Sequence, residues 1–269
     1  MATIVSLKKN KIIFILMNIS SKIYFFSAAM LFATACISPT KIKKVEPATV
    51  QLNSSSKVDS SFTKMIEPYK TSLDREMNQI LIISESVAEK GLPEGRLGNI
   101  TTDMVLKKAN DYSQEQKLEP VDICLLNNGG LRAALPKGEI SLGKVFELMP
   151  FENELVVLTM SGKKTKQMFS AIARDKGMPM GGARVIISDS LLPEVTVGGK
   201  AFDENKNYRV VTSDYLSNGG DKMYFFKSPE RVDTLHHKIR DAIVEYMKEE
   251  NKKGNTLKPQ LDGRISYKK

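Results

Sequence analysis

Histidine and cysteine are scarce in this sequence, and tryptophan is absent. His236 and His237 are the two histidines among 269 residues, and Cys36 and Cys124 are the two cysteines. Two cysteines cannot form the disulfide framework that holds many small secreted domains together. A hydrolase with two metal ions usually takes several histidine ligands from along its chain, so the shortage of histidine argues against a self-sufficient di-metal enzyme.

Long apolar runs are also missing. Polar residues interrupt the stretch Ile12–Phe32, which therefore lacks the unbroken span of about 20 apolar residues that a membrane-crossing helix needs. The remaining composition, with 41% hydrophobic and 26% charged residues, is ordinary for a folded soluble domain. The formal net charge is +9, but the lysines are dispersed and the aromatic residues do not interleave with them. This pattern disfavours a nucleic-acid-binding protein.

The N-terminal sequence is typical of a bacterial lipoprotein signal. The apolar run Ile23–Ala35 ends in small residues and is followed by Cys36, which would become the lipidated first residue of the mature protein. The alternative is a plain secretory signal with an unmodified cysteine, and Met17 is as good a start as Met1. Either interpretation predicts an exported protein of the bacterial cell envelope, periplasmic or on the surface, and the first adds a lipid anchor to the membrane.

Composition divides the chain into three regions. Residues 1–35 are predicted to be the signal peptide. Residues 36–61 are rich in Ser, Lys, Thr and Pro, which predicts a disordered tether. Residues 62–269 have the length of one folded domain of ordinary size.

Helical and strand periodicities alternate irregularly along this domain, which predicts an α+β class (or an irregular α/β one) with a mixed sheet flanked by helices. The segment Leu155–Met160 alternates poorly, so we expect a strand that is covered on both faces. In the predicted helix Asn99–Tyr112, Lys107 and Lys108 are expected to point outward. The predicted helices are Phe62–Arg75, Asn99–Tyr112, Leu142–Leu148, a helix capped by Ser161 that runs to Lys176, and Arg231–Glu250; the predicted strands are Met77–Val87, Val121–Leu126, Leu155–Met160, Val185–Ser188, Glu194–Val197 and Tyr208–Thr212.

Three segments have turn chemistry that is more elaborate than a simple connection requires. Asn127–Arg132 combines amides, a glycine pair and an arginine, Met149–Asn153 places Phe151 directly after a proline, and Asp214–Asp221 combines a tyrosine, a glycine pair and an aspartate. Glycine lets the backbone approach a ligand closely, and Arg132 suits a phosphate or a carboxylate. Taken one at a time, such features are more often turns, core residues or solvated side chains.

In this order, the three segments resemble the C-terminal domain of the 5'-nucleotidase family of secreted metallophosphoesterases. The family pattern runs from a Leu-Gly-Asn helix start through Asn-Gly-Gly-Gly-Ile-Arg and Leu-Pro-Phe-Gly-Asn to Asn-Phe-Leu-Ala-x-Gly-Gly-Asp-Gly. Matching positions in this sequence also include Leu97–Asn99, with Asp103 four residues later, and the terminal Asp262–Ile265. The resemblance extends from about Ile80 to Ile265, which is almost the entire predicted domain.

The resemblance implies a role in nucleotide recognition. In the family, this domain holds the nucleoside, while a separate N-terminal domain carries two metal ions and performs the hydrolysis. The two aromatic rings that stack on the base fall on Phe151 and Tyr215, and the carboxylate that holds the ribose hydroxyls falls on Asp221. Asn127 falls on a position that contacts the sugar, and Arg132 on one that meets the phosphate. The implied substrate-binding set is Asn127, Arg132, Phe151, Asn153, Tyr215 and Asp221.

Four departures from the family pattern bear on this role. Arg96 is what remains of the arginines that precede the helix start, and it sits in a different register. Glu152 replaces a glycine and adds a negative charge near a place meant for an anion, whereas Lys222 replaces another glycine and would restore the balance. Tyr215 stands where the family has phenylalanine, which keeps the aromatic face and adds a hydroxyl. We therefore expect a weakened phosphate contact and a preserved base clamp.

The metal ligands of the family's N-terminal domain have no counterpart in this sequence. Neighbouring side chains on a helix point about 100° apart, so His236 and His237 are poorly placed to chelate one ion together. We expect no catalytic residue, metal or cofactor in this chain, with divalent metals confined to a separately encoded metallophosphoesterase. The favoured interpretation is the recognition half of a split 5'-nucleotidase that acts on nucleoside 5'-monophosphates in nucleotide catabolism. The alternative is a non-enzymatic surface lipoprotein that binds nucleosides or nucleotides.

Overall fold

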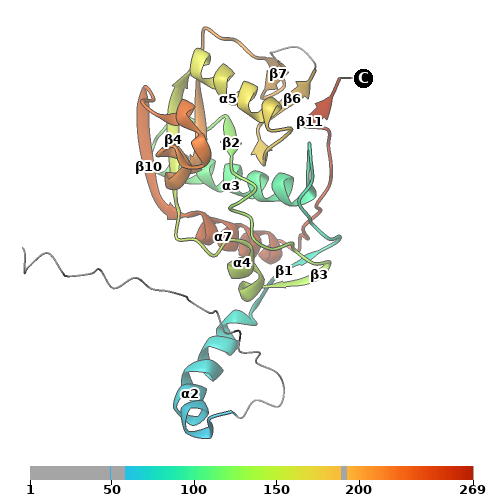
Figure 1. Cartoon of the computed structure of the whole chain (residues 1–269), viewed down its shortest axis with the longest axis vertical. Helices are drawn as coiled ribbons and strands as arrows, with labels where there is room; N and C mark the ends of the chain where they lie inside the picture. Colours follow the sequence, from blue (N-terminus) through green and yellow to red (C-terminus); the bar gives the residue numbers. More distant parts are fainter. Residues whose placement is uncertain (1–48, 50–57, 189–192, 269) are drawn as a thin grey trace, which may run out of the picture. The chain divides into compact units, whose positions relative to one another are not determined.

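The computed structural model describes residue 49, residues 58–188 and residues 193–268 (Figure 1). The predicted signal peptide, Cys36 and almost all of the predicted tether lie outside these residues. From Asp59 onward the chain forms one compact unit. Among the described residues, no helix combines the length and the apolar character that crossing a membrane requires.

A five-stranded mixed sheet lies at the centre of this unit, with the strand order β10-β4-β9-β2-β5. Strands β2 and β9 run parallel, and the other neighbouring pairs run antiparallel. The strands are β2 (Ile123–Leu125), β4 (Glu154–Ser161), β5 (Met180–Gly181), β9 (Asn207–Ser213) and β10 (Arg231–Lys238). The predicted α+β class with a mixed sheet flanked by helices is confirmed.

The central sheet is buried on both faces. Along β4, Leu155 and Val157 join one hydrophobic cluster, whereas Val156 and Leu158 join a second cluster on the opposite face. This distribution follows from the two-residue period of a strand, and it confirms the prediction that Leu155–Met160 is covered on both sides. Cys124 on β2 is fully buried in the first cluster. Removing both faces of the sheet from water is the main source of its stability.

Different elements cover the two faces (Figure 1). The first cluster takes apolar side chains from three helices and a two-stranded antiparallel sheet. The second takes them from one long helix, from a four-stranded sheet of order β11-β6-β7-β8 and from the short helical turns between residues 214 and 226. On the first face lie α3 (Arg96–Glu115), α4 (Leu142–Leu148), α7 (Ile239–Lys252), β1 (Ile80–Ser84) and β3 (Gly138–Ser141); on the second lie α5 (Gly162–Arg174), β6 (Ala183–Ile187), β7 (Glu194–Val197), β8 (Lys200–Ala201) and β11 (Ile265–Tyr267).

The first helix of the described chain is α2 (Ser60–Met77), which confirms the helix predicted over Phe62–Arg75. The Asp59 side chain caps its N-terminus by accepting hydrogen bonds from the backbone N–H groups of Ser61 and Phe62. None of the eighteen residues of this described helix is buried. Five large apolar side chains of this helix are exposed: Phe62, Met65, Ile66, Tyr69 and Leu73.

The helix predicted over Arg231–Glu250 is partly wrong. Its first eight residues form strand β10, and only Ile239–Lys252 is helical. Val232 and Thr234 pair with the exposed edge of β4, where β-branched side chains fit well. The spacing from Leu235 to Ile239 matched a helical period by coincidence, because tertiary pairing outweighed local periodicity here.

Lys108 was expected to point outward on α3, and this expectation is wrong. Its side chain is only 6% exposed, and its ammonium group lies 2.8 Å from a carboxylate oxygen of Glu249 and 3.4 Å from one of Glu245, both on α7. The lysine is buried because α7 packs directly against α3 and supplies acidic partners. Lys107, in contrast, is 59% exposed as predicted.

Candidate functional site

The topology of the central sheet brings the three turn-rich segments to one edge. Because β2 and β9 are parallel neighbours, the segments that follow them leave the sheet at the same edge. These are the loop 127–132 after β2, and helix α6 (Asp214–Ser217) with the 3₁₀ turn η2 (Gly220–Lys222) after β9. Strand β4 runs antiparallel to β9, with Leu155 opposite Ser213, so the segment that leads into β4 arrives at this edge too.

A pocket of about 390 Å³ lies between these segments. It is lined by Asn127, Gly129, Gly130, Arg132, Phe151, Asn153, Tyr215 and Asp221. The structure thus brings all six predicted substrate-binding residues together in one pocket, along with the glycine pair of the first segment. Their roles in binding stay predictions. Arg96, at the start of α3, lies outside this lining.

Two aromatic rings of the pocket are open to solvent. Phe151 is 42% exposed and Tyr215 is 47% exposed. Within the described residues, neither ring stacks on another aromatic ring. A β-carbon added to Gly220 would lie 2.5 Å from the Tyr215 ring, so a glycine is required where the backbone approaches this ring so closely. Both rings are therefore held on the protein surface with aromatic area available to a ligand.

The Asp221 carboxylate receives hydrogen bonds from both sides of the pocket. The Tyr215 hydroxyl donates to Oδ1 at 2.8 Å, and the Asn127 side-chain amide donates to Oδ2. The backbone of Asp221 has φ 50° and ψ 28°, a left-handed conformation that residues other than glycine seldom adopt. The hydrogen bond from Tyr215 raises the pKa of this tyrosine, since it stabilises the protonated hydroxyl.

Arg132 is exposed, and its backbone anchors the loop that carries it. The Arg132 N–H donates to the Leu148 carbonyl at 2.7 Å, which ties the loop to the end of α4. The guanidinium makes one long hydrogen bond, from Nη1 to the Gly129 carbonyl at 3.2 Å. Most of its five donors therefore have no partner among the described residues and can meet a phosphate or a carboxylate.

Glu152 was expected to add a negative charge beside the pocket, balanced by Lys222, and the structure shows different partners for this charge. Its carboxylate forms ion pairs with Lys238 and Arg240 at the start of α7. The hydrogen bonds from Lys238 and then Arg240 lower the pKa of Glu152 to about 2. These two cations provide the balance that was expected of Lys222, whose exposed side chain lies outside the pocket lining.

Further contacts with the start of α7 hold the segment of Phe151 and Asn153 in place. Arg240 Nη1 donates to the Pro150 carbonyl at 3.4 Å, and the Ile239 N–H donates to the Asn153 carbonyl at 3.0 Å. The guanidinium of Arg240 also lies 4.0 Å from the centre of the Phe146 ring, a cation–π contact. Glu152 therefore fastens the segment that carries the first aromatic ring onto α7.

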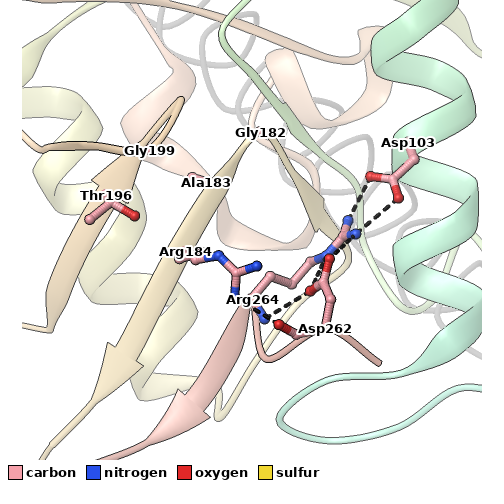
Figure 2. Close-up of a pocket in the computed structure, with 8 residues that line it drawn as sticks. All are labelled: Asp103, Gly182, Ala183, Arg184, Thr196, Gly199, Asp262 and Arg264. Atoms are coloured by element: carbon pink, nitrogen blue, oxygen red, sulfur yellow. Dashed lines mark hydrogen bonds and ion pairs between the residues drawn. The ribbon is translucent and has the colours of Figure 1, made fainter. Parts of the chain in front are cut away.

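A second pocket, of about 190 Å³, is lined in part by Asp103, Asp262 and Arg264, three further positions that the family pattern singled out (Figure 2). Arg264 donates from Nη1 and Nη2 to the two oxygens of Asp103, at 2.7 and 2.9 Å, and from Nε and Nη2 to Asp262. Burial opposes the charge of Arg264, but these hydrogen bonds outweigh burial and raise its pKa. With Asp103 on α3 and Asp262 just before β11, the cluster ties the C-terminal segment to the first face of the sheet.

Sequence reasoning missed Glu94, which completes this cluster. Its carboxylate accepts hydrogen bonds from the Asn99 side chain at 2.6 Å and from the backbone N–H groups of Asp262 and Gly263 at 2.9 and 3.1 Å. A glutamate five residues before Asn99 carries no recognisable signal, because two of its three partners, Asp262 and Gly263, lie 168 and 169 residues further along the chain.

The two histidines lie on a strand and outside both pockets. They belong to β10, not to a helix, and the His237 ring stacks on Tyr112 at a centroid distance of 3.7 Å. In residues 58–188 and 193–268, no three His, Cys, Asp or Glu side chains are grouped so that they would hold a metal ion. The described residues therefore do not fit a metal centre.

Comparison with known proteins identifies the family. The model of the 5'-nucleotidase C-terminal domain matches residues 76–228, which include all six predicted binding residues. The chain belongs to this family. The match ends before Asp262 and Arg264, so the ion-pair cluster lies partly beyond the matched segment of the 5'-nucleotidase C-terminal domain.

The relatives are longer proteins. The chain is 30% identical over 188 residues to the trifunctional nucleotide phosphoesterase protein YfkN of Bacillus subtilis, a match that covers 64% of this chain and 12% of that protein. It is 23% identical over 245 residues to the 5'-nucleotidase of Rattus norvegicus, covering 81% and 42%. The crystal structure of a 5'-nucleotidase precursor from Thermus thermophilus superposes with a TM-score of 0.64 and 26% identity, over 78% of this chain and 43% of the other. The chain thus spans less than half the length of each.

Proposed function

We propose that this protein is the nucleotide-recognition half of a split 5'-nucleotidase. The strongest support is that six residues from three distant segments line one open pocket at the edge of the sheet. Two aromatic faces, a carboxylate and an arginine match the chemistry of a base, a ribose and a phosphate. A nucleoside 5'-monophosphate carries these three groups in one molecule.

In this proposal each part of the nucleotide has its own partners. The base stacks between Phe151 and Tyr215, and each ring contributes about 1–3 kcal/mol and tolerates different bases. Asp221 accepts hydrogen bonds from the ribose hydroxyls, and Asn127 contacts the sugar beside it. Arg132 meets the phosphate with its free donors.

Hydrolysis belongs to another polypeptide in this proposal. The divalent metals of this proposal belong to a separately encoded metallophosphoesterase, and this chain supplies the residues that hold the nucleotide. That partner docks over the face that carries Phe151 and Tyr215. Docking covers the open side of the pocket, which excludes water and fixes the nucleotide relative to the partner's reactive groups.

The location proposed for this complex is the bacterial cell envelope, with Cys36 as the lipid-bearing residue. Similarity to a cell wall protein of Listeria monocytogenes, 26% identical over 192 residues, is consistent with export. A lipid anchor would keep the recognition half at the membrane, where nucleotides from outside the cell are met.

Reconstitution tests the proposal. The full chain is incubated with AMP and a divalent metal, first alone and then with a secreted metallophosphoesterase that has no nucleoside-holding domain of its own. We expect phosphate release only in the mixture, and a loss of that release with Phe151→Ala. Robust release by the chain alone, after exhaustive removal of contaminants, would overturn the split arrangement. Adenosine binding with no effect on hydrolysis by the partner would favour the non-enzymatic nucleoside-binding lipoprotein.

A further inference from the structure

The hydroxyl of Tyr215 has no role in base stacking, which uses only the ring. In the structure, this hydroxyl contacts one residue twice. It donates to Oδ1 of Asp221 at 2.8 Å, and it accepts from the backbone N–H of Asp221 at 3.3 Å. Tyr215 therefore holds both the side chain and the backbone of Asp221.

The backbone at Asp221 needs such support. Asp221 (φ 50°) and Lys222 (φ 63°) are two consecutive non-glycine residues in the left-handed region, where the β-carbon crowds the backbone. Residues persist in this region only when the surrounding structure holds them there. The contacts that hold Asp221 come from Tyr215 on one side and from the Asn127 amide on the other.

These contacts leave the carboxylate half occupied. An ionised carboxylate has about four lone-pair sites, two on each oxygen. Asn127 takes one site on Oδ2 and Tyr215 takes one site on Oδ1, so within residues 58–188 and 193–268 the second site on each oxygen has no side-chain donor. A sugar with two neighbouring hydroxyl groups presents two O–H donors to such a pair of acceptors.

We infer that Tyr215 is a positioning residue whose hydroxyl fixes the Asp221 carboxylate so that it selects nucleosides with an intact ribose diol. The inference rests on the proposed nucleoside binding. With phenylalanine at this position the stacking face would remain, but Oδ1 of Asp221 would lose its donor and the backbone N–H of Asp221 would lose its acceptor.

The test compares two variants with two ligands. Tyr215→Phe removes the hydroxyl and keeps the ring, and Tyr224→Phe is the matched control, because Tyr224 lies nearby in the chain, is 62% exposed and does not line the pocket. Calorimetry measures the binding of adenosine and of 2',3'-dideoxyadenosine. We expect Tyr215→Phe to weaken adenosine binding about threefold to tenfold, the equivalent of one hydrogen bond, and to change dideoxyadenosine binding by less than about twofold. Tyr224→Phe should change neither.

A second measurement is independent of any ligand. Hydrogen exchange of the Asp221 amide, followed by NMR, should be faster in Tyr215→Phe than in the unsubstituted protein and unchanged in Tyr224→Phe. Equal weakening of both nucleosides, unchanged adenosine binding, or unchanged exchange at Asp221 would each overturn the inference. A failure of the unsubstituted protein to bind either nucleoside would refute the proposed function, and with it the selection of nucleosides with a ribose diol. The exchange measurement tests separately whether the Tyr215 hydroxyl holds Asp221.

Discussion

Two pockets of this protein each contain arginine and aspartate side chains, and they differ in how much of the hydrogen-bonding capacity of these side chains is used within the chain. In the Arg264 cluster, Arg264 is 9% exposed and the hydrogen bonds of its guanidinium go to Asp103, Asp262 and a backbone carbonyl, so its hydrogen-bonding capacity is used within the chain. In the pocket that contains Phe151 and Tyr215, called the clamp pocket below, these two residues are nearly half exposed. Asp221 and Arg132 there keep acceptor and donor sites that no described residue fills. A polar cluster whose groups satisfy one another stabilises the fold, whereas one that leaves capacity unused is available to a ligand.

The largest effect is expected from breaking the saturated cluster. Arg264→Met leaves Asp103 and Asp262 without their cation and should lower the free energy of unfolding by about 2–4 kcal/mol, less than for a deeply buried pair because Asp103 is 46% exposed. Urea unfolding followed by circular dichroism measures this loss.

Arg184→Met is the matched control for that variant. Arg184 lines the same pocket, but it is exposed and makes a single hydrogen bond to the Asp262 carbonyl. Its replacement should cost less than about 1 kcal/mol of unfolding free energy. Equal losses in the two variants would show that the Arg264 ion pairs contribute nothing particular.

Substitution in the clamp pocket should weaken ligand binding and leave the free energy of unfolding nearly unchanged. Phe151→Ala is expected to weaken adenosine binding by about 1–3 kcal/mol, because one stacking face is lost. The free energy of unfolding should change by no more than about 0.5 kcal/mol, since the ring is 42% exposed. Tyr267→Ala, at an exposed aromatic residue outside the pocket, should leave binding unchanged. A large loss of stability with unaltered binding would reverse the assignment of the two pockets.

A substitution at Arg132 tests the phosphate contact separately from the nucleoside contacts. Arg132→Gln should weaken AMP binding by about 1.5 kcal/mol, the lower end for a hydrogen bond to a charged group, because the guanidinium is exposed. Adenosine lacks the phosphate, so its affinity should stay the same. Calorimetry with both ligands measures the difference, and an equal loss for both would assign Arg132 to the sugar or to the shape of the loop.

The smallest effect concerns the ion pairs of Glu152. The pKa of Glu152 in the folded protein, about 2, lies below its ordinary value of 4.5, so these pairs stabilise the fold above about pH 4.5. Their contribution is lost as the pH falls from 4.5 towards 2. The melting temperature of Glu152→Gln should therefore lie below that of the unsubstituted protein at pH 6, and the gap should close in acid. A gap that is independent of pH would show that the charge of Glu152 is irrelevant.

Much of the fold was predictable because its core elements have strong local periodicity. The helix α4 was predicted to the residue, and β7 likewise, since turn residues delimit both. The burial of β4 on both faces also followed from its continuous apolar run. The strand β10 was not predictable, because its sequence has helical spacing and only the free edge of β4 makes it a strand.

The site was predictable in membership and unpredictable in its internal contacts. Family motifs predicted that the six pocket residues act together. No local pattern indicates that the Tyr215 hydroxyl reaches Asp221, or that Glu152 pairs with Lys238 at the end of β10 and with Arg240 of α7. Lys108 gives the same lesson, because a lysine on an amphipathic helix becomes buried when a second helix supplies its carboxylates. Such pairings depend on which elements meet, and that information is distributed over the whole chain.

The burial of Cys124 makes its alkylation rate a measure of how often the central sheet opens. This thiol lies on β2, immediately before the Asn127 loop, and full burial raises its pKa well above the usual value. An alkylating reagent can reach it only when the sheet opens, so its modification rate, resolved from that of Cys36 by peptide mass spectrometry, counts those openings. A nucleoside that binds the loops at the edge of the sheet would lower the alkylation rate of Cys124 without contacting the cysteine.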